Sequence, residues 1–162
     1  MGCIKPFTSP DWLMSALERA AEAGKVVDLS NPRMWGQYIH SVRENEYKSA
    51  HPDAKIEKTL PVVKPDGSIG KGKPDAYNPA TNCFIDWKSN DFDKYSSMKE
   101  IIRETVKIAE QMERYRWTTD NDIPGRPRVE VRFEYTPSDP VAKGFIERFL
   151  EGRDIHVVWI HK

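Results

Sequence analysis

Two aspartates and a lysine lie close together in the sequence, on segments that we predict to be neighbouring strands. Asp75 follows Pro74, and Asp86 and Lys88 come after a short turn, inside an otherwise apolar segment. Side chains alternate along a strand, so Asp86 and Lys88 point to one face while Trp87 points to the other. The turn folds the two strands together, which places both carboxylates within reach of one hard cation. Mg²⁺ prefers such ligands, and with a nearby lysine it can activate water.

Each of these residues also has a purely structural interpretation. In that interpretation Asp75 starts a turn, and Asp86 and Lys88 form a solvated ion pair on an outward strand face. However, aspartate and lysine are both depleted from strand interiors, and here both interrupt an apolar strand. The combination therefore favours a functional site.

The spacing of apolar residues and of turn signals predicts the elements that position these residues. Pro after a capping residue and a 3.6-residue repeat indicate helices, and alternation indicates strands. Turns at 65–68 and 78–82 join the first three strands into a meander, and a helix between the last two strands predicts a parallel βαβ unit. The predicted order is α, α, β, β, β, α, β, α, β, with helices over 9–24, 32–47, 96–117 and 140–151 and strands over 56–63, 73–77, 83–88, 129–135 and 155–160. We expect an α/β fold with a mixed sheet, in which residues 1–30 form a helical leader packed on a domain over 31–162.

Length and composition limit the class of protein. The chain has 162 residues, the size of one domain, and its 25 basic and 25 acidic residues give a formal net charge of zero. A globally basic nucleic-acid-coating protein is therefore disfavoured, whereas a nuclease with acidic metal ligands is not. The longest apolar runs are too short to span a membrane, and the start lacks a signal peptide, so we expect a soluble protein that acts in the cytoplasm.

Cysteine and histidine spacing bears on the kind of metal. Cys3 and Cys83 lie far apart, and the four histidines show no zinc-binding spacing, so any metal is expected to have oxygen ligands. The glycine-rich segment 67–72 lacks the spacing of a phosphate-binding loop and opens no helix, so we expect no nucleotide cofactor.

Pro74-Asp75 followed by Asp86-Trp87-Lys88, on consecutive strands after one helix and before a long one, resembles the PD-(D/E)xK nuclease superfamily, which has the restriction-endonuclease fold. The resemblance covers residues 32–162, because the α-β-β-β-α-β core of that family, with a further helix and strand, agrees with the predicted order. It implies that Asp75 and Asp86 bind Mg²⁺ together with the carbonyl of Trp87. It also implies that Lys88 assists the water that attacks a phosphodiester, and that Mn²⁺ can replace Mg²⁺.

Members of this family often supply one more acidic residue from the helix before the sheet. Glu44 and Glu46 are the candidates here. We prefer Glu46, because it lies four residues beyond Val42, on the apolar side that is expected to face the sheet, whereas Glu44 projects away. The alternative is an ordinary amphipathic helix end.

Two further groups of residues are candidates for nucleic-acid binding. Gln111 and Tyr115 match a QxxxY element of some family members and share a helix face, so they are expected to contact a base or phosphate. The alternative places Tyr115 in the core and Gln111 at the surface. Lys64, Lys71 and Lys73 surround the first hairpin and could hold a phosphate backbone, or else simply guard a strand edge.

The sequence therefore predicts a Mg²⁺-dependent endonuclease acting on DNA or tRNA. The compact domain is similar to restriction-fold toxin domains of bacterial contact-dependent effectors in interbacterial competition. That similarity implies a cognate immunity protein as a partner and action in the cytoplasm of a target cell. The alternatives are a stand-alone phage or repair nuclease, and a non-catalytic binding module that keeps the fold. Such a module would have lost Asp75, Asp86 or Lys88, and all three are present.

Overall fold

The structure, a computed structural model, describes residues 32–161, so the predicted leader over 1–30 lies outside the described residues. No helix in the described range is long and apolar enough to cross a membrane. The elements are α2 (Pro32–Ala50), β1 (Lys55–Ile56), β2 (Leu60–Val63), β3 (Ile69–Gly72), β4 (Ala76–Asn78), β5 (Cys83–Lys88), the 3-10 helix η1 (Phe92–Lys94), α3 (Met98–Arg116), β6 (Arg128–Tyr135), α4 (Pro140–Glu151) and β7 (Ile155–His161).

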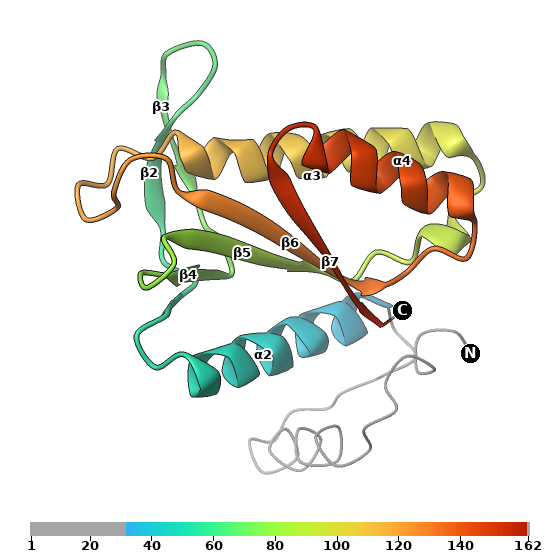
Figure 1. The fold of residues 1–162 in the computed structure, drawn as a ribbon, viewed down its shortest axis with the longest axis horizontal. Helices are drawn as coiled ribbons and strands as arrows, with labels where there is room; N and C mark the ends of the chain where they lie inside the picture. The colour runs from blue at the N-terminus through green and yellow to red at the C-terminus, as the bar shows by residue number, and fades with distance from the viewer. Residues whose placement is uncertain (1–31, 162) are drawn as a thin grey trace.

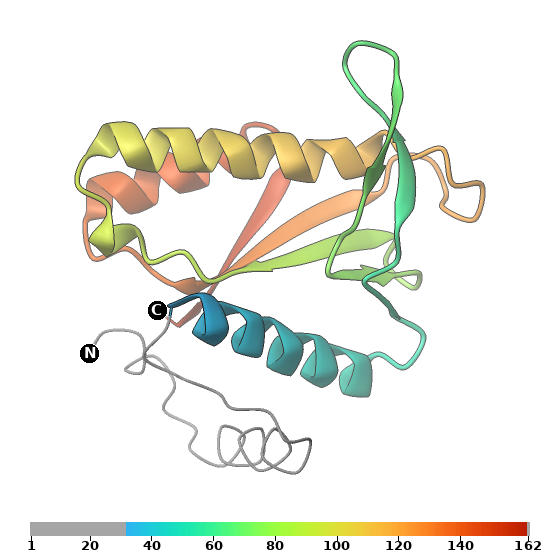
Figure 2. The same ribbon diagram turned by 180° about the vertical axis from the view of Figure 1, so that it is seen from behind.

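A five-stranded mixed sheet forms the centre of the molecule, in the order β1-β4-β5-β6-β7. Strands β1, β4 and β5 pair antiparallel, and β5, β6 and β7 pair parallel. Helices α3 and α4 cover one face of this sheet, and α2 lies against the other (Figures 1 and 2). The predicted α/β fold with a mixed sheet, half meander and half parallel, is therefore confirmed.

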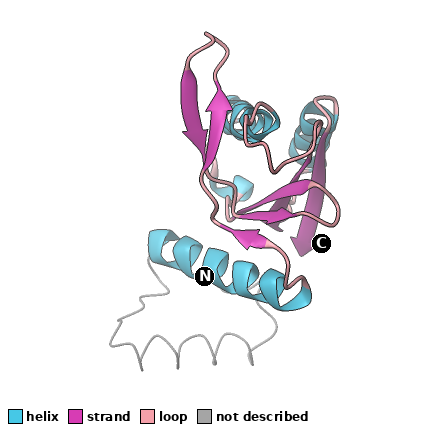
Figure 3. Ribbon diagram, turned by 90° about the vertical axis from the view of Figure 1, so that its left-hand side faces the viewer, coloured by secondary structure: helices cyan, strands magenta, loops and turns pink. Residues whose placement is uncertain are grey.

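The first hairpin differs from the prediction. The segment predicted as one strand over 56–63 is divided: β1 joins the main sheet, whereas β2 pairs with β3 in a separate hairpin that stands away from the body (Figure 3). The turn at 65–68 forms as predicted, with Gly67 at a φ of 86°. The turn joins two antiparallel strands, and Val63 and Ile69 are the paired residues nearest to it. The strand predicted over 73–77 is shifted and shorter in the structure, where β4 covers Ala76–Asn78. Its predicted neighbours are confirmed in part, because β4 pairs with β1 and with β5 but not with the 60–63 segment.

Strand β5 is the part of the sheet on which the proposed chemistry depends. Five of its six residues are buried. Ile85 and Trp87 pack on the side of α2, where Tyr47 meets the Trp87 ring at 5.6 Å between centroids. Phe84 packs on the side of α3, 5.7 Å from the Tyr115 ring. Asp86 and Lys88 share the face of Phe84, because side chains alternate along the strand, and this part of the prediction is confirmed by their contacts with α3.

Polar contacts attach α2 to the sheet. The Arg43 guanidinium donates to both carboxylate oxygens of Glu134 on β6, with the shortest contact at 2.5 Å. Glu134 is only 1% exposed, so its charge depends on this partner. Asn78 donates to the Tyr47 hydroxyl at 2.8 Å. These contacts fix the helix so that its polar residues lie over the edge of β4 and β5.

Candidate functional site

Asp75 and Asp86 are held together by reciprocal contacts between neighbouring strands. The backbone N–H of Asp75 donates to Oδ1 of Asp86 at 2.8 Å, and the backbone N–H of Trp87 donates to Oδ2 of Asp75 at 2.8 Å. Ala76 pairs with Ile85, so the two aspartates occupy the next position along both strands. The predicted convergence of the two carboxylates therefore follows from strand register.

Trp87 presents a backbone carbonyl to the same place. Its N–H points towards Asp75, as the hydrogen bond to that carboxylate shows. The N–H and C=O of one strand residue point to the same side of the strand, so the Trp87 carbonyl also points to this edge. Its indole ring lies on the opposite face, against Tyr47. The main chain, and not the side chain, is what Trp87 offers to the site.

Lys88 lies beside Asp86 and is oriented by α3. Its Nζ is 3.6 Å from Oδ2 of Asp86 and donates to the Gln111 side-chain oxygen at 2.6 Å. Gln111 in turn donates to the Tyr115 hydroxyl at 3.3 Å, and that hydroxyl donates to Oδ2 of Asp86 at 3.0 Å. Gln111 and Tyr115 thus share a helix face, as predicted, and both of them orient the charged groups of β5.

The burial of Tyr115 argues against the direct nucleic-acid contact predicted from its motif. The residue is 1% exposed, and its ring lies against Gly72, where a Cβ would come within 3.2 Å of two ring carbons. Glycine at this position therefore lets the base of the hairpin approach the ring. Tyr115 is therefore a core residue, as the alternative interpretation expected, and its hydroxyl donates a hydrogen bond to Asp86.

Helix α2 adds a second group of potential ligands. A ligand atom from each of His40, Glu44 and Asp75 lies within 4.8 Å of the other two. His40 Nδ1 is 3.6 Å from Oδ2 of Asp75. The Glu57 carboxyl group also lies beside Glu44, and it contributes to the raised pKa of Glu44. We call Asp75, Asp86, Lys88, His40 and Glu44 together the carboxylate site.

The predicted orientation of the two glutamates of α2 is wrong. Glu44 is buried at 8% exposure, whereas the side chain of Glu46 is 48% exposed and pairs with Arg43 at 3.2 Å. The prediction assumed that the apolar stripe containing Val42 faces the sheet at the position of the site. Instead, Arg43, Glu44 and Tyr47 turn inward along the second half of the helix, because the sheet offers polar and aromatic partners there.

Burial and crowded negative charge shift the titration of the site. Burial raises the pKa of Glu44 to about 8, and the nearby Glu57 and Asp75 carboxylates add to the shift. Burial also raises the pKa values of Asp75 and Asp86, while the Lys88 ammonium opposes the shift in both. Burial and Lys88 lower the pKa of His40, so its imidazole is neutral at neutral pH. The site therefore gathers more carboxylate charge than its cations balance.

These donors fit a divalent cation. The carboxylate oxygens of Glu44 and Asp75 are hard ligands of the kind that Mg²⁺ takes, and a neutral imidazole at His40 is a ligand that Mn²⁺ accepts more readily than Mg²⁺ does. Asp86 and the backbone of Trp87 lie beside this group, on the strand pair that holds Asp75. The raised carboxyl pKa values point the same way, because a cation would relieve the repulsion that now favours protonation.

The three candidate lysines differ in position. Lys73 lies at the base of the hairpin, where its carbonyl oxygen is 3.4 Å from the Tyr115 hydroxyl and its Nζ pairs with Glu57 at 3.3 Å. Lys71 is exposed on β3 opposite Pro61, and Lys64 follows β2 with its methylenes against Gly70. The structure thus brings Lys73 next to the carboxylate site, while Lys64 and Lys71 stay on the projecting hairpin.

One member of the site, His40, was missed by reasoning from the sequence, and Glu44 was a candidate that was set aside in favour of Glu46. His40 and Glu44 are four residues apart, a spacing that puts both on one helix face, so a search for His-x-x-x-Glu would have found them. The spacing between the histidines themselves, which bears on zinc sites, does not indicate this pair. Glu57 had no comparable signal, because it lies between two short strands with a φ of 51°.

No protein-family model matches this chain, and no curated protein matches it in sequence. Its function is therefore argued from the geometry of the site.

Proposed function

We propose that this chain is a Mg²⁺-dependent nuclease of the PD-(D/E)xK superfamily that hydrolyses phosphodiester bonds of DNA or RNA. The observation that carries the proposal is the pair of contacts that joins Asp75 and Asp86 across β4 and β5, with Lys88 Nζ 3.6 Å from Asp86. A solvated surface ion pair would not bury two carboxylates beside each other, since each unpaired buried charge costs several kcal/mol.

The arrangement of the sheet supports the same family. Helix α2 precedes the antiparallel strands β1, β4 and β5, and α3 then crosses to β6, which pairs parallel to β5. In this proposal these elements correspond to the α-β-β-β-α-β order of the restriction-endonuclease core. The hairpin of β2 and β3 is then an insertion between the first two core strands, and α4 with β7 is an extension.

The residues have separate roles in this proposal. Asp75, Asp86 and the Trp87 carbonyl hold the cation, and Glu44 completes the set from α2. The cation, when bound, would polarise the phosphate and help to activate water. Lys88 lies on the Asp86 side, where its ammonium orients the attacking water and stabilises the charge that develops on the phosphate. Gln111 positions Lys88, and Tyr115 positions Asp86.

Cleavage of plasmid DNA and of total tRNA by the purified chain tests the proposal. We expect cleavage with Mg²⁺, none with EDTA, and a loss of at least about 10³-fold in Asp86→Asn. Glu44→Gln and Glu46→Gln form a matched pair on one helix: the first should lose most activity and the second little. Cleavage that survives EDTA or Asp86→Asn would contradict the proposal.

We further propose, from the similarity to restriction-fold toxin domains, that the nuclease acts in interbacterial competition and has a cognate immunity protein. Expression of the chain alone should then stop growth of the host, and Asp86→Asn should remove the toxicity. Harmless expression of a nuclease that is active in vitro would favour the stand-alone phage or repair enzyme. Stable binding of nucleic acid without cleavage would favour the non-catalytic module.

A further inference from the structure

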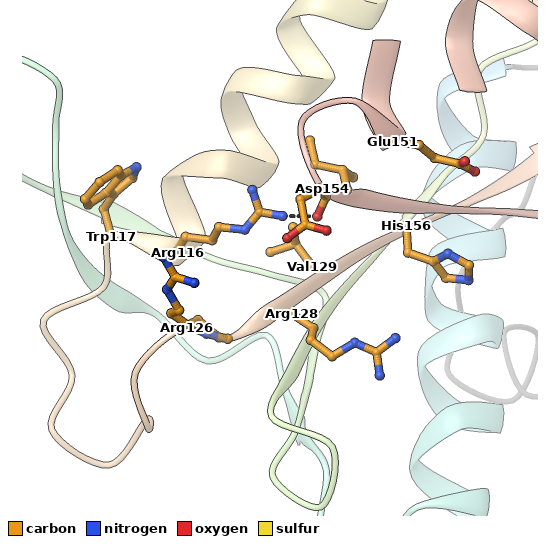
Figure 4. Close-up of a pocket in the computed structure, with 10 residues that line it drawn as sticks. Arg116, Trp117, Arg126, Arg128, Val129, Glu151, Asp154 and His156 are labelled. Atoms are coloured by element: carbon orange, nitrogen blue, oxygen red, sulfur yellow. Dashed lines mark hydrogen bonds between the residues drawn. The ribbon is translucent and has the colours of Figure 1, made fainter. Parts of the chain in front are cut away.

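A second candidate binding surface lies where α3 ends and β6 and β7 begin. It is a cleft of about 760 Å³, a volume in the range of pockets that hold small organic ligands. Trp117 and Arg126 lie at one side of it, and Arg128 and His156 at the other (Figure 4). We call it the arginine cleft; it is lined by Arg116, Trp117, Arg126, Pro127, Arg128, Val129, Glu151, Asp154, Ile155 and His156.

Trp117 has a fixed backbone and a free ring face. It caps α3, and its carbonyl accepts from the backbone N–H of Val63 at 3.0 Å. The residue is nevertheless 66% exposed, although tryptophan is usually well buried. An anchored, solvent-facing indole is a surface on which a nucleic-acid base can stack, because every base has a π face.

Two of the cleft's guanidinium groups have no carboxylate partner among the residues that the structure describes. Arg126 and Arg128 are exposed, and within residues 32–161 neither is within ion-pair distance of a carboxylate. Arg116 differs, since it donates to the backbone carbonyls of Arg153 and Asp154 and so forms part of the wall. Guanidinium groups bind phosphate oxygens through paired N–H donors, so Arg126 and Arg128 are available for a phosphate backbone.

The loop holds Arg126 in an unfavourable conformation. Its φ is 59°, a left-handed value that costs a non-glycine residue about 1 to 2 kcal/mol, and the residue precedes Pro127, which adds restriction. The loop is fixed on both sides: Asn82 donates to the Pro124 carbonyl at 3.3 Å and accepts from the Arg128 N–H at 2.8 Å. An arginine at a position that suits glycine is an observation that favours a binding role.

The acidic residues of the cleft decide which kind of nucleic acid fits. Glu151 and Asp154 are exposed beside the arginines, and they would repel the dense phosphate charge of a duplex. Carboxylates do, however, accept hydrogen bonds from the amino groups of bases whose edges are open. We propose that the arginine cleft binds an unpaired segment of the nucleic-acid substrate, with a base on Trp117 and phosphates on Arg126 and Arg128.

This inference rests on the proposed function, because it treats the bound strand as substrate. The two sites are linked by the last turn of α3: Tyr115, whose hydroxyl contacts Asp86, is two residues before Trp117. A strand that is held at the cleft would therefore be held next to the helix end that positions Asp86. The substrate would be a single strand or the unpaired loop of a folded RNA, in preference to continuous duplex.

Binding of fluorescein-labelled ten-nucleotide strands, measured by anisotropy, tests the inference. The assay uses the full chain with Asp86→Asn, in EDTA, so that no cleavage occurs and failure of the nuclease proposal does not affect the result. Arg126→Gly with Arg128→Gln should weaken binding by at least about 10-fold and flatten its salt dependence by about 0.7 per lost phosphate contact. Trp117→Ala should weaken it by about 10-fold, and Trp117→Phe should restore most of the affinity.

Matched controls separate binding from folding. Arg103→Gln, an exposed arginine near the start of α3, should leave the affinity unchanged. The Arg126→Gly substitution relaxes the left-handed backbone, so the melting temperature of this variant should not fall. The single variant Arg128→Gln repeats the binding test without a change in the backbone. Equal binding by wild type and cleft variants would overturn the inference, as would a duplex of the same sequence that binds as tightly as the single strand. Metal-dependent cleavage would remain intact in either case.

Discussion

The carboxylate site is built from buried and partly buried titratable groups, whereas the arginine cleft is lined mainly by exposed side chains. Asp86 touches Lys88, Tyr115 and the backbone of Asp75, so each of its oxygens has a partner within the protein. Arg126 and Arg128 reach solvent from a loop and from a strand end. Buried charges are costly unless they are paired, so the first region fixes geometry and tolerates little change. The second can be altered with small effects on stability, which makes it suited to adjusting what is bound.

The largest effect is expected at Lys88. Lys88→Met removes the ammonium that faces Asp86, and we expect cleavage to fall by about 10³-fold, as for the loss of an acid–base or electrostatic group. Single-turnover cleavage with saturating Mg²⁺ measures the change. The control is Lys107→Met, because Lys107 is an exposed lysine of α3 that pairs with Glu104. This variant should cleave at the wild-type rate. A loss below about 10-fold in Lys88→Met would mean that Lys88 is only structural.

The next effect concerns the attachment of α2. Arg43→Met leaves the Glu134 charge buried without its bidentate partner, so the free energy of unfolding should fall by about 3 kcal/mol. Urea unfolding at pH 7 measures it. The double variant Arg43→Met with Glu134→Leu should recover most of this loss, because an apolar pair needs no ionic partner. A loss under about 1 kcal/mol in Arg43→Met would show that α2 does not depend on this pair.

The pH dependence of stability should report the charge crowding around Glu44. In the folded protein burial raises the pKa of Glu44 to about 8, against 4.5 for an unperturbed glutamate. Between these pH values the folded state retains a proton that the unfolded chain has released, so stability falls as pH rises. We expect a loss of about 1 to 3 kcal/mol from pH 5 to pH 8 in EDTA.

Urea unfolding at both pH values, with and without Mg²⁺, measures this loss. Glu44→Gln should flatten the profile, and Glu46→Gln should leave it unchanged, since Glu46 is half exposed. Mg²⁺ at pH 8 should restore stability in wild type, because a cation replaces the proton. A profile that is flat in wild type would contradict the burial of Glu44.

The smallest effects are expected in the arginine cleft. Trp117→Ala and Arg128→Gln should each change the free energy of unfolding by less than about 1 kcal/mol, because both side chains are exposed. Thermal unfolding followed by circular dichroism measures the change. A loss above about 2 kcal/mol from either substitution would show that the cleft residues support the fold, and the contrast between the two regions would be lost.

Features that depend on residues close together in the sequence were predictable, and features that depend on distant residues were not. The alternation in β5 and the turn at 78–82 depend on neighbouring residues, so the shared face of Asp86 and Lys88 and the approach of Asp75 were predictable. The mixed sheet followed from the order of the elements. The apolar stripe of α2 is buried as predicted, at Trp35, Ile39 and Val42, but it did not predict the positions of the two glutamates, because Arg43 and Glu44 find polar partners on the sheet side while Glu46 stays exposed.

Features that depend on contacts between distant segments could not be predicted from the sequence. The hairpin of β2 and β3 was merged with the main sheet, since Gly-Lys-Gly in β3 is a poor strand signal. The arginine cleft joins residues from 116–117, 126–129 and 151–156, and no pattern in any one of these segments indicates that they meet.

The most direct measurement of the central claim is the anomalous diffraction of crystals of the full chain soaked in Mn²⁺. We expect an anomalous peak within coordinating distance of carboxylate oxygens from both Asp75 and Asp86, and no peak at that position in Asp86→Asn. A saturating soak that gives no peak there, or a peak that contacts neither aspartate, would contradict it.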